Sequence, residues 1–341
     1  MMSIPCQDLN LPLICQLHFV RLLPVVVPRK PFDLQIVFLP FQFPKEREAD
    51  RVIGAHFRGK MGLLMQEGDR MMDLVERAAA DLVKSTYAIA LTGAGISTES
   101  GIPDFRGPSG IWTKDPEAEK RAYQSYAKFQ KNPKEYWEDR LTGPSLLGDL
   151  DKMAPNPGHH ALAQLERMGI LKCLITQNID SLHQKAGNRR VLDYHGNVFK
   201  LRCVSCSGRF EARDFDLQRL RMEGQLPPLC QRCGGVLKSD VVHFHEPIPA
   251  DIGQQSLAEA GKCDLVLICG TSAVVYPFAL LPRVAKQRPP GKGTILIEIN
   301  AEPTALTEGK ISDYLIQGKT GQILPQIVEE VTRLSERRPL N

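Results

Sequence analysis

The chain has 341 residues, a formal net charge of +4, 43% hydrophobic residues and 24% charged residues. This length accommodates one large domain or two ordinary ones, and the apolar content is sufficient for a packed core. The mild charge does not demand a nucleic-acid partner, and no apolar run reaches the ~18 residues of a membrane helix. The nearest candidate, residues 11–28, is interrupted by Arg21 and three prolines.

Residues 1–60 differ in character from the rest of the chain. They are rich in Pro and Phe and show neither a helical period nor a lasting alternation. They lack the features of a signal peptide, and no amphipathic, Arg-rich helix of a mitochondrial transit peptide can be drawn in them. We therefore expect a poorly ordered extension before a folded region at 61–335, with Met61, Met71 and Met72 as plausible initiators.

Periodic structure is predicted from residue 71 onward. Residues 71–85 have the apolar spacing of a helix and many Ala, Leu and Glu residues. Short apolar runs that are typical of buried strands follow, with helix-like segments between them, at 87–91, 171–176, 264–269 and 294–299. Non-alternating strands separated by helices indicate a parallel sheet with both faces covered. The sequence thus predicts an α/β fold with a Rossmann-like, doubly wound parallel sheet.

Two stretches interrupt this alternation of strands and helices. Residues 108–156, with two tryptophans, are predicted to be a helical insertion, and the loop-rich residues 196–240 a small inserted module that carries two CxxC pairs. The large lobe would then consist of the remaining segments, 71–107, 157–195 and 241–335.

A glycine-rich stretch, GAGISTESGIPDFRG (93–107), follows the strand predicted at 87–91. Glycine directly after a strand lets backbone amides approach a pyrophosphate. The next glycine after the GAG triplet is Gly101, so the usual dinucleotide fingerprint is not matched, and a tight strand-to-helix turn would explain GAG alone. The triplet at 104–106 adds an acid, a ring and a cation that no turn requires, which favours a loop covering a phosphate-bearing ligand.

Further polar groups follow the strand predicted at 171–176. Gln177, Asn178 and Asp180 would lie at the carboxyl end of that strand, where open α/β sheets bind ligands. Taken alone, an Asn/Asp-capped turn into a helix explains them more simply. His195 is either a satisfied core histidine or a general base that titrates near neutral pH.

The three other histidines near these segments, His159, His160 and His183, have no comparable context. We expect them to be surface or capping residues.

Four of the nine cysteines form two chelating pairs, Cys203-x-x-Cys206 and Cys230-x-x-Cys233, separated by residues 207–229. Four thiolates suit one tetrahedral zinc ion with no open position for water, which makes its expected role structural. A redox pair or buried free thiols are the alternatives. Cysteine usage of this kind favours a reducing compartment, and we expect the protein to be cytoplasmic.

These blocks, taken in order, resemble the sirtuin family of NAD-dependent protein deacylases. The resemblance rests on GAGISTESGIPDFRG, TQNIDSLHQKAG (176–187), YHGN (194–197), the CxxC pairs, GTS (270–272) and IN (299–300), and it spans about residues 72–335. It implies removal of acetyl groups from protein lysines with NAD as co-substrate, releasing nicotinamide and O-acetyl-ADP-ribose. The implied partners are acetylated proteins, with no direct nucleic acid and no membrane.

The resemblance also implies roles for individual residues. His195 would be the general base that activates a ribose hydroxyl, while Asn178 and Asp180 would line the nicotinamide pocket. The residues implied to contact NAD are Gly93, Ala94, Gly95, Thr98, Asp104, Phe105, Arg106, Gln177, Asn178, Ile179, Asp180, His195, Gly270, Thr271, Ser272, Asn300 and Thr320.

The sequence departs from the family pattern in the strand that pairs with substrate. Where the family usually has Phe-Gly-Glu, this chain has HFHE (243–246), with His245 at the glycine position. The two histidines either flank the acyl-lysine tunnel or lie at the surface. Asp104 stands where sirtuins that prefer acidic acyl groups usually have Thr, which favours acetyl over succinyl.

Two other functions use the same NAD site. The first is mono-ADP-ribosyl transfer, and the second is an NAD-responsive binding protein with little turnover. Retention of His195, Asn178 and Asp180 argues against the binding-only function.

Overall fold

The computed structural model describes residues 25–28, 34–37, 70–107, 110–143, 147–287 and 293–337. The chain divides into two units, Met1–Glu67 and Gly68–Asn341. In the first unit, β1 (Val25–Pro28) pairs antiparallel with β2 (Leu34–Val37). The rest of the poorly ordered extension predicted at 1–60 lies outside the described residues.

The second unit is built on a six-stranded sheet in the order β11-β10-β9-β3-β4-β5, with every neighbouring pair parallel. The strands are β3 (Ala88–Thr92), β4 (Leu171–Thr176), β5 (Val191–Asp193), β9 (Leu265–Cys269), β10 (Ile295–Asn300) and β11 (Tyr314–Gln317). Counted along the chain within this sheet, the order is the Rossmann order 3-2-1-4-5-6, which reverses between β3 and β9. The predicted fold class is confirmed.

The four predicted strands agree with the structure to within one residue at each end. Sequence reasoning missed β5 and β11, the two edge strands of the sheet. They have only three and four residues, so neither provides an apolar run long enough to stand out.

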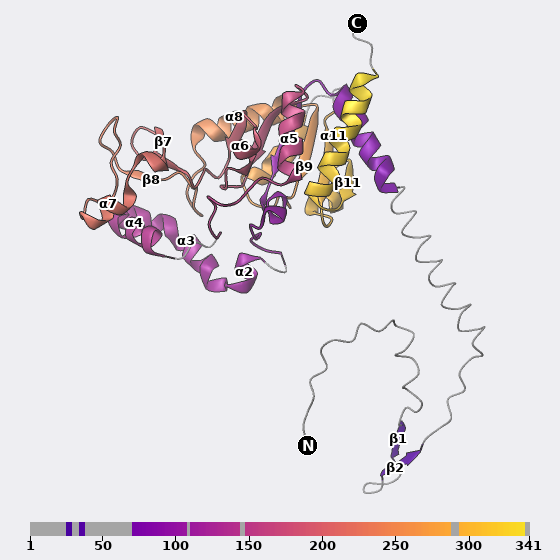
Figure 1. Cartoon of the computed structure of the whole chain (residues 1–341), viewed down its shortest axis with the longest axis horizontal. Helices are drawn as coiled ribbons and strands as arrows, with labels where there is room; N and C mark the ends of the chain where they lie inside the picture. The colour runs from indigo at the N-terminus through magenta and orange to yellow at the C-terminus, as the bar shows by residue number, and fades with distance from the viewer. Residues whose placement is uncertain are drawn as a thin grey trace, which may run out of the picture. The chain divides into compact units, whose positions relative to one another are not determined.

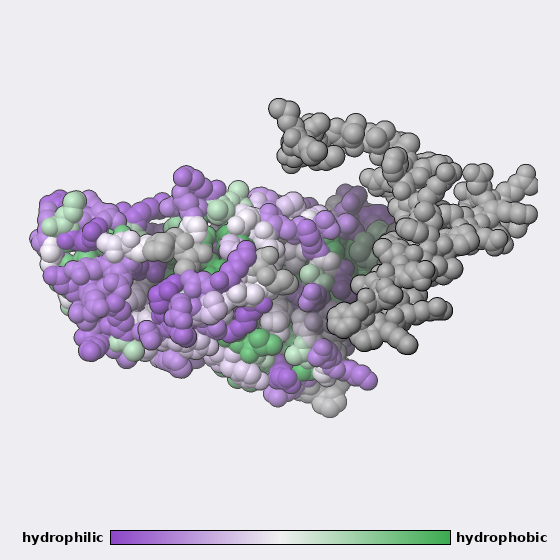
Figure 2. All heavy atoms as spheres, turned by 90° about the horizontal axis from the view of Figure 1, so that it is seen from below, coloured by the Kyte–Doolittle hydropathy of each residue, from purple (hydrophilic) through white to green (hydrophobic). Residues whose placement is uncertain are grey.

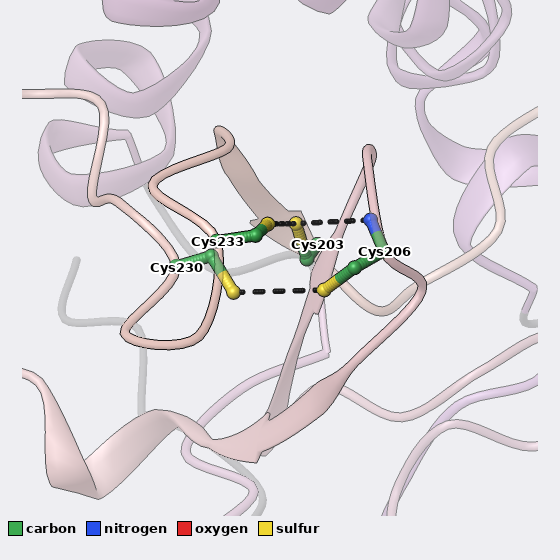
Figure 3. A group of neighbouring side chains, drawn as sticks. All are labelled: Cys203, Cys206, Cys230 and Cys233. Atoms are coloured by element: carbon green, nitrogen blue, oxygen red, sulfur yellow. Dashed lines mark hydrogen bonds between the residues drawn. The ribbon is translucent and has the colours of Figure 1, made fainter.

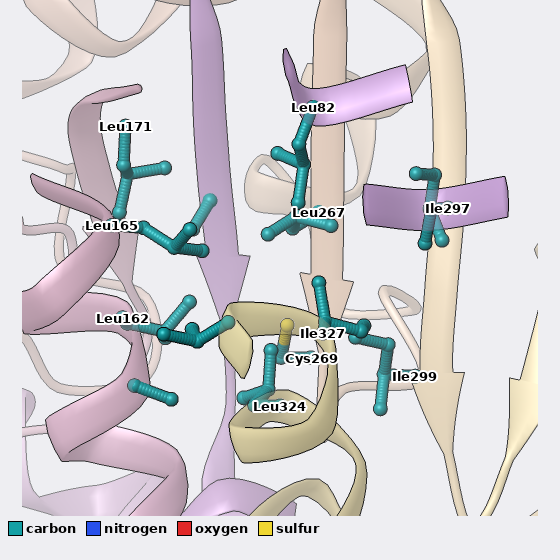
Figure 4. Packing of buried hydrophobic residues seen from close by; sticks show 14 of the residues in the cluster. Leu82, Leu162, Leu165, Leu171, Leu267, Cys269, Ile297, Ile299, Leu324 and Ile327 are labelled. Atoms are coloured by element: carbon teal, nitrogen blue, oxygen red, sulfur yellow. The ribbon is translucent and has the colours of Figure 1, made fainter. Parts of the chain in front are cut away.

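Helices cover both faces of the sheet (Figure 1). Alternate residues of β3 enter opposite cores: Ala88 and Ala90 join one cluster, and Ile89 and Leu91 join the other. The first core packs against the helix at 70–84, α5 (Pro157–Arg167) and α11 (Thr320–Glu336), as Figure 4 shows in close-up. The second packs against α8 (Ala250–Lys262) and α9 (Leu281–Lys286).

The predicted helical and cysteine-bearing insertions lie beside each other and share one core (Figure 1). Phe129, Tyr136 and Trp137 pack against Leu201 and Leu237, and Trp137 Nε1 donates to the Leu237 carbonyl at 2.9 Å. The helices are α2 (Ile111–Lys114), α3 (Pro116–Lys131), α4 (Pro133–Thr142) and α7 (Leu217–Met222), and the antiparallel sheet contains β6 (Lys200–Cys203), β7 (Arg209–Glu211) and β8 (Leu237–Ser239). We call this assembly the small lobe.

Capping explains where α3 and α4 begin. Asp115 and Asn132 accept backbone hydrogen bonds from the first turn of these two helices, and a proline occupies the first position of each. Two shorter helices follow strands of the sheet along the chain: α6 (Leu182–Ala186) comes after β4, and α10 (Ala305–Glu308) comes after β10.

Over the part of the chain that the structure describes, no helix is long and apolar enough to cross a membrane. The face seen in Figure 2 is largely hydrophilic, with small, separate hydrophobic areas.

Candidate active site and metal centre

The loops after β3 and β9 touch at the point where the strand order reverses. Gly95 N donates to the Gly270 carbonyl at 2.8 Å, and Gly93 N to the Cys269 carbonyl at 3.3 Å. A Cβ on Gly95 would lie 2.8 Å from Gly270 Cα, and one on Gly270, whose φ is +61°, would lie 2.2 Å from Ile96 N. The glycines therefore permit a backbone contact that any side chain would prevent.

This contact is not the start of an α-helix. Residues 94–96 and 98–100 form two short 3₁₀ turns, and the amides of Gly93 and Gly95 are already engaged within the protein. What the glycines contribute is the close approach of two loops at a ligand-binding position of the fold.

Side chains from the loop after β4 tie these loops together. Gln177 Nε2 donates to Thr271 Oγ1 at 2.6 Å, and Asn178 Nδ2 donates to the Gly93 carbonyl at 3.1 Å. Asn300 Nδ2, at the end of β10, donates to the Thr271 carbonyl at 3.2 Å. Polar residues from the ends of four parallel strands, β3, β4, β9 and β10, thus meet at one edge of the sheet.

Asp180 is buried beneath this edge. Its Oδ2 accepts from Ser97 Oγ at 2.7 Å and its Oδ1 from Leu182 N at 2.9 Å. Burial raises the pKa of Asp180, and the two hydrogen bonds oppose that rise. Sequence reasoning missed Ser97, which also accepts from Asn178 Nδ2 at 3.1 Å. The available signal was its place within the glycine-rich stretch.

His195 is held in one orientation by the main chain. Its Nδ1 lies 3.3 Å from the Gln177 carbonyl, to which only an Nδ1–H can donate, so Nε2 keeps its lone pair. The rings of Tyr194 and Phe278 lie beside it. Burial lowers the pKa of His195 to about 4 against the opposing effect of the hydrogen bond. The imidazole is therefore neutral at pH 7 and able to accept a proton.

Four other predicted NAD contacts lie at the same end of the sheet but differ in exposure. Thr98 Oγ1 donates to the Gly95 carbonyl at 2.9 Å, and the Ile179 carbonyl accepts from Val198 N at 3.0 Å. Ser272 is exposed, whereas Thr320, the first residue of α11, is buried, and its hydroxyl has no hydrogen-bond partner among the residues that the structure describes.

The DFR triplet faces the small lobe. Asp104 Oδ1 accepts from Gly107 N at 2.9 Å, and the Phe105 ring lies 4.9 Å from that of Trp112. The Arg106 guanidinium lies 4.7 Å from the same indole and 3.9 Å from Glu119. Phe105 and Arg106 thus contact side chains of α2 and α3, whereas Asp104 is bonded within its own loop.

Two of the three histidines set aside from the site are buried within it. His159 is a capping residue, as predicted, because its Nδ1 accepts from Asn156 N in a capping box at the start of α5. The expectation for His183 was wrong: it is buried, and its Nε2 lies 2.9 Å from Thr92 Oγ1. His160 is exposed, as predicted. The spacing of apolar residues in the sequence did not indicate that His183 would be buried against Thr92 at the end of β3.

The HFHE segment adjoins both the candidate active site and the small lobe. Val242 N donates to the His195 carbonyl at 2.8 Å. His243 is part-buried, with Nε2 2.8 Å from the Tyr136 hydroxyl, whereas His245 is exposed at φ +65°. Phe244 stacks on Tyr123 with ring centroids 4.2 Å apart.

The four predicted metal ligands converge in the small lobe (Figure 3). Their sulfur atoms all lie within 4.8 Å of one another, with 3.6 Å between Cys203 and Cys233 and 3.7 Å between Cys206 and Cys230. A tetrahedral site with Zn–S bonds of about 2.3 Å has sulfur–sulfur edges of about 3.8 Å. The spacing fits zinc and is far longer than a disulfide.

Backbone amides of Ser205 and Cys206 donate to the Cys203 sulfur, and that of Arg232 donates to Cys230. Such donors stabilise thiolates, the form that binds metal.

Taken together, the fold and site define an α/β protein with a ligand site at the switch point of a Rossmann-type sheet and a four-cysteine metal centre. Comparison with known proteins identifies the family. The Sir2 family model matches residues 93–277, and the chain belongs to the Sir2 family.

Relatives match nearly their whole length. An NAD-dependent protein deacylase of Pyrococcus furiosus is 43% identical over 75% of this chain and 97% of its own. NAD-dependent protein deacylase 2 of Archaeoglobus fulgidus is 44% identical over 79% of this chain and all of its own. A solved structure reported under the words "Structural Basis for the Mechanism and Regulation of Sir2 Enzymes" is similar to this chain with a TM-score of 0.61 and 45% sequence identity. The match covers 77% of this chain and 99% of the solved chain. A Sir2 homologue in complex with NAD has a TM-score of 0.60 and 38% identity, covering 76% and 94%.

Proposed function

We propose that the protein is an NAD-dependent protein-lysine deacetylase that releases nicotinamide and O-acetyl-ADP-ribose. The observation that carries this proposal is the meeting of the GAG and GTS loops at the switch point, with a neutral His195 anchored beside Gln177. Bound there, NAD would supply an electrophilic ribose carbon and nicotinamide as leaving group.

The chain's own residues would divide the work between binding and proton transfer. The two glycine loops, with Gln177 and Asn300, would bind the phosphates and riboses. Asn178 and Asp180 would orient the carboxamide, since each presents polar atoms at the buried end of the site. His195 Nε2 would accept the proton of a ribose hydroxyl, because its other nitrogen is held by a carbonyl and its pKa lies below neutrality.

Similar structures support this chemistry. Sir2 homologues have been solved with ADP-ribose, with 2′-O-acetyl-ADP-ribose and with a deacetylated p53 peptide beside 3′-O-acetyl-ADP-ribose. Another was solved with a myristoylated histone peptide. Acylated proteins are accordingly the proposed substrates of this chain, with acetyl favoured over succinyl because of Asp104.

The four cysteines would hold one structural zinc, since all four positions of a tetrahedral ion are taken by sulfur. We also propose that the small lobe and the sheet domain are the two parts of a catalytic domain at 61–335. The protein would work in the cytoplasm, where thiols stay reduced, and cell fractionation tests that location.

An assay with labelled NAD and matched acetylated and unmodified proteins tests the proposed function. Deacetylation predicts label in acetyl-ADP-ribose only when the acetylated protein is present. Label on the unmodified protein would instead indicate mono-ADP-ribosyl transfer. Binding of NAD with neither product would contradict both enzymatic functions.

A further inference from the structure

The HFHE segment forms a turn with a strained residue at its third position. Glu246 N donates to the His243 carbonyl at 3.1 Å, which closes a turn over residues 243–246. His245, at the third position, has a φ of +65°. Glycine is usual where a turn needs positive φ at this position, because a Cβ there costs free energy. A side chain held in such a conformation calls for a compensating contact or a function.

The side chains before His245 are anchored to the small lobe, whereas that of His245 is not. His243 Nε2 lies 2.8 Å from the Tyr136 hydroxyl, and Phe244 stacks on Tyr123 with ring centroids 4.2 Å apart. His245 is exposed, and its ring centroid lies 5.7 Å from that of Tyr123. The strain at His245 is therefore not offset by burial.

The turn lies beside the proposed general base. Val242, the residue before the turn, donates through its backbone N to the His195 carbonyl at 2.8 Å. Three residues of chain, at most about 11 Å, lead from Val242 to His245. A bound peptide has the same rise per residue, so side chains that flank an acetyl-lysine held near His195 come within reach of the His245 imidazole.

Positive charges act on this turn. Burial lowers the pKa of His243 to about 3, and nearby positive charges lower it further. Those charges belong to Lys238, Arg140 and Arg202. Glu246, the last residue of the turn, is paired with Lys238 Nζ at 3.0 Å and with Arg202 Nη2 at 2.6 Å, so its own charge is balanced. An acidic side chain that approaches the turn from solvent therefore meets a positive field.

We propose that His245 is a specificity-determining residue that donates a hydrogen bond to an acidic side chain near the acetyl-lysine of the substrate. An imidazole carries at least one N–H in either protonation state, and a carboxylate is a stronger acceptor for it than a neutral amide. The contact is made to the flank of the substrate and not to the reacting atoms. The inference rests on the proposed function, because its ligand is an acetylated protein.

Acetylated peptides with a single Glu, scanned through the residues on both sides of the acetyl-lysine, test this preference. Each is compared with the same peptide carrying Gln. At one position or more we expect kcat/KM to be about 5-fold higher for the Glu peptide, the upper range for an exposed ion pair. The difference should appear in KM, because a contact with the flank is equally strong before and in the transition state. Equal kcat/KM at every position would overturn the proposal.

Three variants assign the preference to His245. His245→Gly removes the side chain and relieves the strain, so it should lose the preference while melting at the same or a higher temperature. His245→Asp tolerates the left-handed conformation and should favour a peptide with Lys over one with Glu. His160→Asn is the matched control, because His160 is an exposed histidine outside the turn, and it should keep the preference. An acidic preference that persists in His245→Gly or in His245→Asp would contradict the assignment.

Peptide binding, measured by fluorescence anisotropy, separates this inference from the proposed function. An unmodified protein without NAD-dependent deacetylation would contradict the proposed function. Even without turnover, the labelled Glu peptide should bind about 5-fold more tightly than the Gln peptide, and the difference should shrink at high salt. Equal affinity for the two peptides would overturn the inference.

Discussion

Gly270 and His195 illustrate what single residues contribute at the carboxyl edge of the sheet. Gly270 brings two backbones into contact at a φ that L side chains rarely adopt. His195 is a titratable group whose protonation is set by its surroundings rather than by its own chemistry. Gly270 shapes the site and His195 is its proposed proton acceptor, so we expect replacement of the two residues to have different effects.

His195→Ala is expected to lower deacetylation about 10²- to 10⁴-fold, because it removes the proposed general base. Binding of NAD should persist, since the glycine loops and Gln177 remain. Steady-state deacetylation and calorimetric NAD titration measure the two properties separately. Deacetylation close to that of the unmodified protein would eliminate His195 as the base.

Gly270→Ala is expected to destabilise the fold by about 3 kcal/mol or more, because the new Cβ would collide with backbone. Gly169→Ala is the matched control: its φ is +72°, but a Cβ there meets nothing within 4 Å. It should cost only the ~1 kcal/mol of the left-handed conformation. Denaturant unfolding of both variants measures the difference, and equal losses would show that the loop contact has no energetic weight.

Among the elements, the small lobe depends on partners from distant parts of the chain. Its core combines α3 and α4 with β6 and β8, and the Trp137 indole is bonded to the main chain of β8. Two of the four cysteines, Cys203 and Cys230, are buried in that same core. We therefore expect metal binding and helix packing to be coupled in this lobe.

Removal of zinc should unfold the small lobe and expose Trp137. The purified protein is expected to contain about one zinc per chain, and Cys230→Ser should lose it together with deacetylase activity. Cys173→Ser is the control, because Cys173 is buried in the sheet away from the cluster. Metal analysis and tryptophan fluorescence report the two effects. An active, folded sample without zinc would contradict the assignment.

At the scale of the whole molecule, burial gathers neutral imidazoles around one region. Burial lowers the pKa of His159 and His195 to about 4 and of His243 to about 3, and it also lowers the pKa of His183 well below its ordinary value. Between about pH 6.5 and pH 4 the unfolded chain binds protons at these histidines that the folded chain does not bind. Acid therefore favours unfolding.

Stability should accordingly decrease as pH falls from about 6.5 toward 4. At pH 5.5 these histidines should add roughly three to four protons to the uptake on unfolding. Calorimetry in buffers of different ionisation enthalpy measures that uptake, and His243→Gln should reduce it by about one proton. A free energy of unfolding that stays constant between pH 7 and 5 would contradict this prediction.

Removal of residues 1–60 is expected to leave folding and deacetylation nearly intact. The motifs lie at 93 and beyond, and the four hydrophobic clusters found among the described residues involve residues from 71 onward. Comparing the melting temperature and kcat of the full chain and the truncated chain checks this. A large fall in melting temperature would assign the extension a structural role.

The sequence by itself determined the parallel α/β fold, the two glycine loops at the carboxyl edge of the sheet and the four cysteines that form one cluster. Apolar runs, glycine positions and cysteine spacing are local patterns, and each has a local physical cause. Tertiary structure alone decided that the two insertions share a core and that Ser97, His159 and Asp180 form one buried chain. Those contacts join residues that are 62 to 100 positions apart. Which of them meet depends on how the strands are ordered in the sheet, and no period or spacing encodes that order.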